Sequence, residues 1–339
     1  MLKNKKHKGS ESMTYKHLST FERECIFKYL ALNYSVTKIA ELLGRNKSTI
    51  SRELQRNKGE YSPSRATENY IKRRKNSKSA KKLDDPELFS MVKKFFLEFH
   101  WSPEQISNRL RIENYPIQIS YNTIYRAIYS GKFSSESEKK AGTKGAIGKL
   151  RHKGKPRYGK NQDERRGKIP ISNNLSERPV LANERKRLGD YEADTVLGLT
   201  GKACLLTLTD RKSRFLIARK VAQKKSELIA ESMVSALQSV PLHSITPDRG
   251  KEFAKHSLVS EKLHGVPFYF PLPHQPWQRG TNENTNGLLR EYFPKGKDLT
   301  DVSETTLQNV VDQLNKRPKK CLGYKTPWEI FFSTSLHFT

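Results

Sequence analysis

Three carboxylates in the second half of the chain have the types and spacing to bind metal ions together: Asp194, Asp248 and Glu283. Converging carboxylates repel one another unless cations lie between them. Their hard oxygen atoms favour Mg²⁺ or Mn²⁺. Two such ions about 3.5–4 Å apart activate an attacking oxygen and stabilise the leaving one. The set predicts phosphodiester chemistry with two Mg²⁺ ions, for which Mn²⁺ is expected to substitute.

Other acidic residues compete for these roles, because acidic residues are common in any chain. Three of them lie close to Asp194 and one lies close to Asp248: Asp190, Glu192, Asp210 and Glu252. Residue types and spacing alone leave this choice open.

The segments around the three carboxylates predict an α/β fold. Strands are expected near 187–199, 203–210, 214–222, 244–248 and 266–273, and helices near 226–240, 281–293 and 304–316. This order is that of a ribonuclease-H-like core, in which carboxylates of the first and fourth strands lie side by side and a later helix brings the third. We expect this catalytic core over residues 181–335, with the last helix packed into it.

The N-terminal part predicts a helix-turn-helix domain over residues 14–60. Ser19 and Glu22 form a capping-box pattern, and Gly44 suits the end of the second helix. The third helix presents polar and basic side chains that suit the major groove. Its candidate DNA contacts are Lys47, Ser48, Thr49, Ser51, Arg52, Gln55 and Arg56.

A second unit of helix-turn-helix type is expected over residues 84–131. Asp85, Ser102 and Ser120 each suit a helix N-cap. The candidate DNA contacts on its last helix are Tyr121, Asn122, Thr123 and Arg126. The connection at 111–119 is longer than a tight turn, so a packing module is the alternative interpretation of this unit.

The overall charge indicates a polyanionic partner. The 339-residue chain has 64 Lys and Arg against 35 Asp and Glu, a formal net charge of +29. Such a surface attracts phosphate backbones and displaces their counterions. Residues 132–180 are rich in Lys and Gly and are expected to be a basic linker. No run approaches the roughly 18 apolar residues of a membrane span. We therefore expect no membrane partner and a location in the bacterial cytoplasm, associated with the nucleoid.

Several segments closely resemble one protein family. PHQPWQRGTNENTNGLLREYFPKGKDL at 273–299, TPDRGKEF at 246–253 and GDYEADTV at 189–196 are similar to the three acidic segments of the IS-thirty family of bacterial insertion-sequence transposases. IAELLGRNKSTISREL at 39–54 and LNKRPKKCLGYKTPWE at 314–329 also match. Arg249, Tyr191 and Ala193 depart from frequent family residues, and none of them replaces a carboxylate.

The resemblance implies a multidomain protein with all-α helix-turn-helix N-terminal modules and an α/β ribonuclease-H-like, integrase-type catalytic core. It implies Asp194, Asp248 and Glu283 as the acidic triad of a DDE transposase. The implied partner is double-stranded DNA, as terminal inverted repeats and as target, bound by a homo-oligomer in a synaptic complex. Further candidate DNA contacts surround the third carboxylate: Arg279, Asn282, Asn286 and Arg290. Trp277 is expected to pack.

Two other functions remain open at this point. One is a sequence-specific DNA-binding regulator of the same element whose core is inactive, which the intact triad disfavours. The other is a general nuclease with the same core, which does not need two sequence-reading units.

Overall fold

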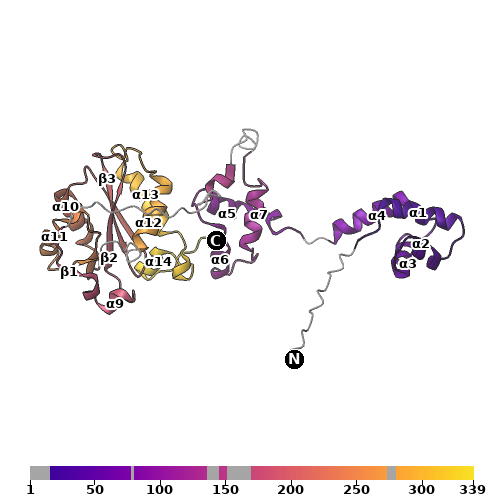
Figure 1. Cartoon of the computed structure of the whole chain (residues 1–339), viewed down its shortest axis with the longest axis horizontal. Helices are drawn as coiled ribbons and strands as arrows, with labels where there is room; N and C mark the ends of the chain where they lie inside the picture. Colours follow the sequence, from indigo (N-terminus) through magenta and orange to yellow (C-terminus); the bar gives the residue numbers. More distant parts are fainter. Residues whose placement is uncertain (1–15, 78–79, 136–144, 151–168, 273–279) are drawn as a thin grey trace, which may run out of the picture. The chain divides into compact units, whose positions relative to one another are not determined.

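The structure is a computed structural model that describes residues 16–77, 80–135, 145–150, 169–272 and 280–339. The chain forms two compact units, Met1–Lys81 and Lys82–Thr339, and Figure 1 shows their elements. None of the helices in the described ranges is long and apolar enough to cross a membrane.

The first unit contains four helices. They are α1 (Thr20–Ala31), α2 (Val36–Leu42), α3 (Lys47–Arg56) and α4 (Pro63–Asn76). The predicted capping box of Ser19 and Glu22 is present at the start of α1. Gly44 has the left-handed conformation that ends α2, with φ of 59°. Helix α4 is not predicted from the sequence, and it extends the unit beyond residue 60.

Helix α4 belongs to the core of the first unit. Its Ala66 is buried in one cluster with Ile26, Ile39 and Ile50 of the other three helices. The buried ion pair of Arg23 and Glu53, with 2.7 Å between Nε and Oε1, joins α1 to α3. The Arg23 guanidinium also lies 4.9 Å from the ring centre of Tyr70, on α4. The four helices therefore pack as one domain.

The second unit begins with a helical module. It contains η1 (Lys82–Asp84), α5 (Pro86–Leu97), α6 (Pro103–Ile112), α7 (Tyr121–Tyr129) and η2 (Gly145–Lys149). Asp85, Ser102 and Ser120 cap the three α-helices, as predicted. Trp101 stacks on Phe95 at 4.6 Å and meets the ring of Phe338 edge-on at 5.0 Å.

The stretch expected to be a basic linker differs from that expectation at both ends. Phe133 is 1% exposed and Ala146 is also buried, both in the core of the helical module. Ile169 and Ile171 pack against the α/β core. Residues 136–144 and 151–168 lie outside the described residues. The sequence did not indicate these contacts, because isolated apolar residues in a basic segment show no periodicity.

The α/β core is built on a mixed sheet. Its strands are β2 (Asp190–Leu197), β3 (Cys204–Asp210), β4 (Leu216–Val221), β5 (Ser244–Thr246) and β6 (Tyr269–Phe270), with β1 (Asn173–Asn174) parallel to β6. The order is β4-β3-β2-β5, and a parallel bridge from Ile245 to Phe268 adds the β6 segment. The first three strands are antiparallel, and β5 runs parallel to β2. This is the predicted ribonuclease-H-like topology.

Helices cover both faces of this sheet (Figure 1). One face packs against α10 (Ser226–Leu237) and α11 (His256–Lys262), and the other against α12 (Gly280–Tyr292) and α13 (Glu304–Asn315). The core position predicted for α13 is confirmed by buried Leu307, Val311 and Leu314. The remaining short elements are η3 (Leu175–Glu177), α9 (Val180–Asn183), η4 (Lys251–Phe253), η6 (Lys320–Leu322) and α14 (Pro327–Phe332).

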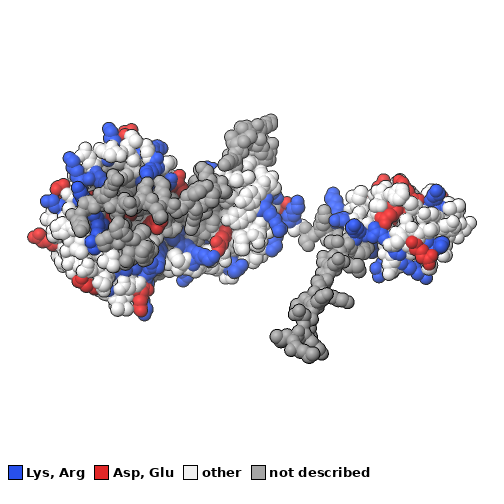
Figure 2. Space-filling model, viewed as in Figure 1, with Lys and Arg blue, Asp and Glu red and all other residues white. Residues whose placement is uncertain are grey.

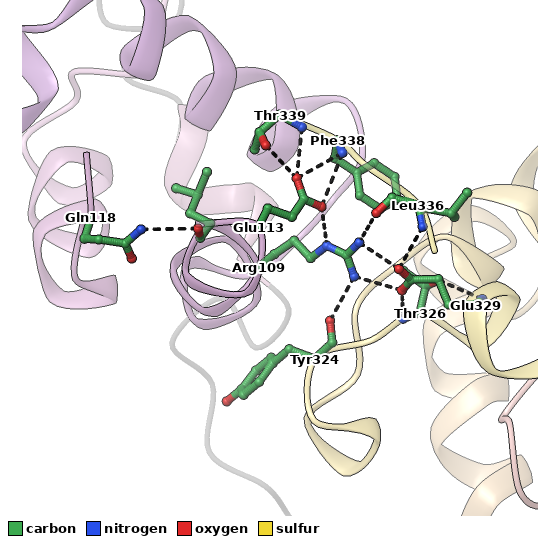
Figure 3. A network of polar contacts seen from close by, with 10 residues as sticks. Arg109, Glu113, Gln118, Tyr324, Thr326, Glu329, Leu336, Phe338 and Thr339 are labelled. Carbon is green, nitrogen blue, oxygen red and sulfur yellow. Dashed lines mark hydrogen bonds and ion pairs between the residues drawn. The ribbon is translucent and has the colours of Figure 1, made fainter. Parts of the chain in front are cut away.

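The helical module is joined to the C-terminal segment of the core by a buried polar network (Figure 3). Arg109 of α6 forms ion pairs with Glu113 on its own helix and with Glu329 of α14. Glu113 in turn accepts hydrogen bonds from the backbone N–H groups of Phe338 and Thr339. The module and the core therefore share a buried interface, which explains why they form one unit.

Candidate active site and nucleic-acid interface

Two of the three predicted carboxylates lie on, or just after, one parallel pair of strands. The register pairs Glu192 of β2 with Thr246 of β5. Asp194 lies two residues beyond Glu192 on β2, and Asp248 lies two residues beyond Thr246, after the end of β5. Both carboxylates therefore belong to the same end of this parallel strand pair.

Backbone amides orient both carboxylates. Asp194 Oδ1 accepts from the N–H of Thr195 at 2.7 Å, and Asp248 Oδ1 accepts from the N–H of Gly250 at 2.8 Å. Asp248 is 6% exposed. A Cβ atom on Gly250 would lie only 2.7 Å from Asp248 Oδ1 and 2.3 Å from Glu252 Oε2. The loop can approach both carboxylates closely because residue 250 has no side chain.

Glu283 lies in the first turn of α12 and is exposed. The helix is held against the Asp194 strand by polar contacts. Thr207 Oγ1 of β3 lies 3.2 Å from the carbonyl oxygen of Asp194 and 3.1 Å from Asn286 Oδ1. Glu283 and Asn286 are three residues apart and share one side of the helix. Among the described residues, no three His, Cys, Asp or Glu side chains lie close enough together to hold a metal ion.

The carboxylates that compete with Asp194 are engaged in structural contacts. Asp190 pairs with Arg187 at 2.9 Å and accepts from the Ser244 hydroxyl at 2.6 Å. Asp210 accepts from the Ser213 hydroxyl at 2.6 Å and from the Gly189 N–H at 2.8 Å. Both carboxylates are buried. They shape the ends of the strands and do not offer open ligand positions.

Glu192 is a closer competitor, because it shares a face of β2 with Asp194. Its carboxylate is fully buried, forms an ion pair with Arg211 and accepts from the N–H of Asn282 at 3.1 Å. Burial lowers the pKa of Arg211, and the charge of Glu192 opposes that shift. The hydrogen bond from Asn282 attaches α12 to the sheet.

Glu252 competes with Asp248 and lies beside it. Lys224 Nζ is 2.6 Å from Glu252 Oε1, and the Thr195 hydroxyl donates to the same oxygen at 3.1 Å. Glu252 therefore connects η4 to the residue that follows Asp194. Its charge is already paired with a lysine, which favours a positioning role.

The third helix of the first unit presents the predicted face. Lys47, Ser48, Arg52, Gln55 and Arg56 are exposed, and Thr49 and Ser51 are half-buried. Ile50 and Glu53 point into the domain. This arrangement agrees with the predicted recognition helix.

A groove of about 560 Å³ separates α3 from α4. Arg52 and Arg56 line it from α3, and Arg73 and Arg74 line it from α4. These four guanidinium groups suit a phosphate backbone. The α4 residues are not among the contacts predicted from the sequence, although the run KRRK at 72–75 is a signal for them.

Helix α7 of the second module also presents its predicted residues. Tyr121, Asn122 and Arg126 are exposed and Thr123 is half-buried, while Ile124 and Ile128 are buried. The exposed side carries rings at four-residue spacing: Tyr121 meets Tyr125 at 6.5 Å, and Tyr125 stacks on Tyr129 at 6.3 Å. Basic side chains are spread over both units (Figure 2).

Comparisons with known proteins agree with this architecture. A family model described as a helix-turn-helix domain matches residues 14–57. The transposase for insertion sequence element IS4351 of Bacteroides fragilis is 39% identical over 93% of this chain and 95% of its own length. Transposase InsI for insertion sequence element IS30A of Escherichia coli is 39% identical over 93% of this chain and 83% of its own length. The chain belongs to the IS30 (IS-thirty) family of transposases.

Other relatives extend this result. The transposase for insertion sequence element IS1086 of Cupriavidus metallidurans is 35% identical over 93% of this chain and 94% of its own length. Among solved structures, the catalytic core domain of BIV integrase aligns with 42% of this chain and 93% of that chain, at 18% identity and a TM-score of 0.34. The fold assignment rests on the strand order described above. As an IS30-family transposase, the chain is a DNA-binding, nucleic-acid-processing enzyme.

One predicted DNA contact of this transposase is wrong. Asn282 of α12 is fully buried, and neither polar atom of its side chain has a hydrogen-bond partner among the described residues. Its backbone N–H binds Glu192, which turns the residue toward the sheet. Asn286 and Arg290 are half-buried. Arg290 donates to the carbonyl oxygens of Leu197 and Phe293. Arg279 and Trp277 lie outside the described residues.

Proposed function

We propose that this chain is a DDE transposase that binds the terminal inverted repeats of its insertion sequence and catalyses DNA strand cleavage and strand transfer. The observation that carries the proposal is the parallel pairing of β2 with β5, because Asp194 and Asp248 each lie two residues beyond the last paired residues, Glu192 and Thr246. Helix α12, which contacts the neighbouring strand β3 through Asn286 and Thr207, supplies Glu283.

The donor set suits two Mg²⁺ ions, with Mn²⁺ as a substitute. Asp194, Asp248 and Glu283 offer only carboxylate oxygens, the ligands that hard divalent cations prefer. When bound, such ions supply Lewis acidity and an activated oxygen nucleophile. The protein's own part is to hold these carboxylates in place. The Thr195 and Gly250 amides orient two of them, and Glu192, paired with Arg211, accepts a hydrogen bond from the Asn282 N–H on the helix that carries the third.

DNA recognition is assigned to α3 and α7. The exposed faces of these helices carry Arg, Gln, Asn and Tyr side chains that suit base edges and phosphates. Two reading helices in one chain suit an inverted repeat longer than one helix spans. We propose that a homo-oligomer brings two such ends together with target DNA.

The test is cleavage of a plasmid that carries the element's ends, with Mg²⁺, Mn²⁺ or EDTA. Asp248→Asn is compared with wild type and with Asp301→Asn, which alters an exposed aspartate of the same core. We expect metal-dependent cutting at the ends, reduced by Asp248→Asn more than about a hundredfold, or about 2.7 kcal/mol. End binding should persist in both variants.

Two outcomes would overturn the proposal. Tight end binding without cutting by wild type in either metal would indicate a regulator. Cutting without preference for the ends would indicate a general nuclease.

A further inference from the structure

A small basic pocket lies beside the N-terminus of α12, away from Glu283. Its volume is about 210 Å³, and Arg185, Arg214, Lys319, Thr281, Asn284 and Cys321 are among the residues that line it. With about 100° between successive helical residues, Thr281 and Asn284 lie on one side of α12. Glu283, Asn286 and Arg290 lie on another. The pocket is therefore separate from the carboxylate face of the same helix.

The described residues that line this pocket include three cationic side chains and no carboxylate. The Arg214 guanidinium donates to the Thr281 hydroxyl at 2.6 Å, and the described residues offer it no ion pair. The Arg185 side chain has neither a hydrogen bond nor an ion pair within the described ranges. Nearby arginines differ, because Arg187 pairs with Asp190 and Arg211 pairs with Glu192.

Both pocket arginines have an unusual backbone. Arg185 has φ of 58° and Arg214 has φ of 62°, in the left-handed region that glycine or asparagine adopts at lower cost. The Arg214 turn contains two hydrogen bonds, because Asp210 accepts from the Ser213 hydroxyl and N–H within it. Residues in this conformation tend to gather at binding and catalytic sites. Here each turn carries a long cationic side chain to the same pocket.

The N-terminus of α12 adds to the positive charge of this pocket. Gly280 and Thr281, in the first turn of the thirteen-residue α12, line the pocket. The N–H groups of a first turn have no partner within the helix and carry partial positive charge. A cavity of this size admits a phosphate group with a few waters, since one water takes about 30 Å³.

We propose that this pocket binds a phosphate group of the DNA backbone. The inference rests on the proposed function, which supplies the DNA. Arg185, Arg214 and Lys319 would hold the phosphate from three segments of the chain. A phosphate bound at this end of α12 fixes the helix against the DNA and sets the position of Glu283 on its other side. The residues of the pocket are thus positioning residues.

Cys321 provides a direct probe, because it lines the pocket and is exposed. The experiment measures its alkylation in full-length Cys25→Ser protein that also carries Asp248→Asn. Cys204 should stay unreactive, because burial raises its pKa to about 11. A duplex with one element end should slow the alkylation of Cys321 several-fold.

Substitutions of the pocket arginines test whether they cause the protection of Cys321 by bound duplex. Arg185→Gln with Arg214→Gln should abolish it and lower the salt dependence of duplex binding by about 0.9 in slope, the value for one phosphate. Arg185→Gln alone should weaken protection without a folding defect, because the Arg185 side chain forms no hydrogen bond or ion pair with the described residues. The control pair, Lys186→Gln with Lys212→Gln, changes neighbouring lysines that do not line the pocket.

Three results would overturn the inference. Bound duplex could leave the alkylation rate unchanged. Protection could persist in the double arginine variant. Inorganic phosphate at matched ionic strength could protect Cys321 while duplex does not, which would make the pocket a free-anion site. If wild type never cleaves DNA but duplex protection follows the arginines, the pocket is supported and only the proposed catalysis fails.

Discussion

Arg109 of α6 and Glu329 of α14 form a two-point ion pair, with Nη1–Oε2 and Nη2–Oε1 distances of 2.8 Å each. Their side chains are 2% and 6% exposed. The same guanidinium binds Glu113, so one arginine serves two buried carboxylates. This contact joins the helical module of the second unit to α14, the last helix of the core.

Removing this arginine should destabilise the second unit strongly. Arg109→Met leaves Glu113 and Glu329 buried without their cation, and breaking a buried pair costs about 3–5 kcal/mol. Chemical denaturation measures the free energy of unfolding, with the exposed Arg111→Met as control. A change below about 1 kcal/mol, the level of a surface pair, would contradict the buried pairing.

The same pair predicts a specific loss of stability in acid. Burial raises the pKa of Glu329, but hydrogen bonds from Arg109 and from the Leu336 and Thr326 amides outweigh it and lower the pKa to about 2. The ordinary value is about 4.3. The stabilising contribution is therefore complete above that value and is lost as the pH falls toward 2. Glu329→Gln should be less stable at neutral pH and lose less stability on acidification. Equal slopes of unfolding free energy against pH would refute this.

The structure explains which predictions the sequence supported. N-caps at Ser19, Asp85, Ser102 and Ser120 were predictable because a cap depends on residues within one turn. Helix α4 was missed because only Ala66 on it is buried, so it has no apolar stripe. The Arg109–Glu329 contact joins residues far apart in the chain, and no local pattern records it.

At the candidate site, the roles of the acidic residues also depend on contacts that no local sequence pattern records. Glu192 and Asp194 lie two apart on β2 and therefore share one face, so alternation does not distinguish them. The two residues differ in burial. Glu192 is buried against Arg211, and that contact depends on the β3–β4 turn. Asn282 was misplaced for a related reason: the buried side of α12 is polar near its start, so composition suggested exposure.

Replacing Glu192 and Asp194 of β2 one at a time should show which carboxylate stabilises the fold and which is needed for DNA cleavage. Glu192→Gln leaves Arg211 buried beside a neutral partner and should lower the melting temperature. Asp194→Asn should leave it nearly unchanged while abolishing cleavage. Thermal unfolding and plasmid cleavage measured on both variants test this. An Asp194→Asn protein that still cuts, or a fully stable Glu192→Gln protein, would contradict the assignment.

The groove between α3 and α4 predicts two kinds of DNA contact. Arg73→Gln and Arg74→Gln should weaken binding to every sequence and lower the salt slope by about 0.9 for each phosphate that is no longer bound. Gln55→Ala should instead cost about 1–3 kcal/mol on the element end alone. Titrations at several salt concentrations on specific and unrelated duplexes distinguish the two. Lys28→Gln on α1 is the matched control, and an equal effect from it would exclude a localised contact.

Trp101 lies where the rings of Phe95 and Phe338 meet, beside the Arg109 network. The chain has three tryptophans, so replacing Trp277 and Trp328 with Phe would leave a single emitter in that interface. Its fluorescence should move to longer wavelength when the residues around Phe338 separate from α6 and water reaches the indole. The interface thus contains its own optical reporter, which can follow the junction between the helical module and the core during DNA binding.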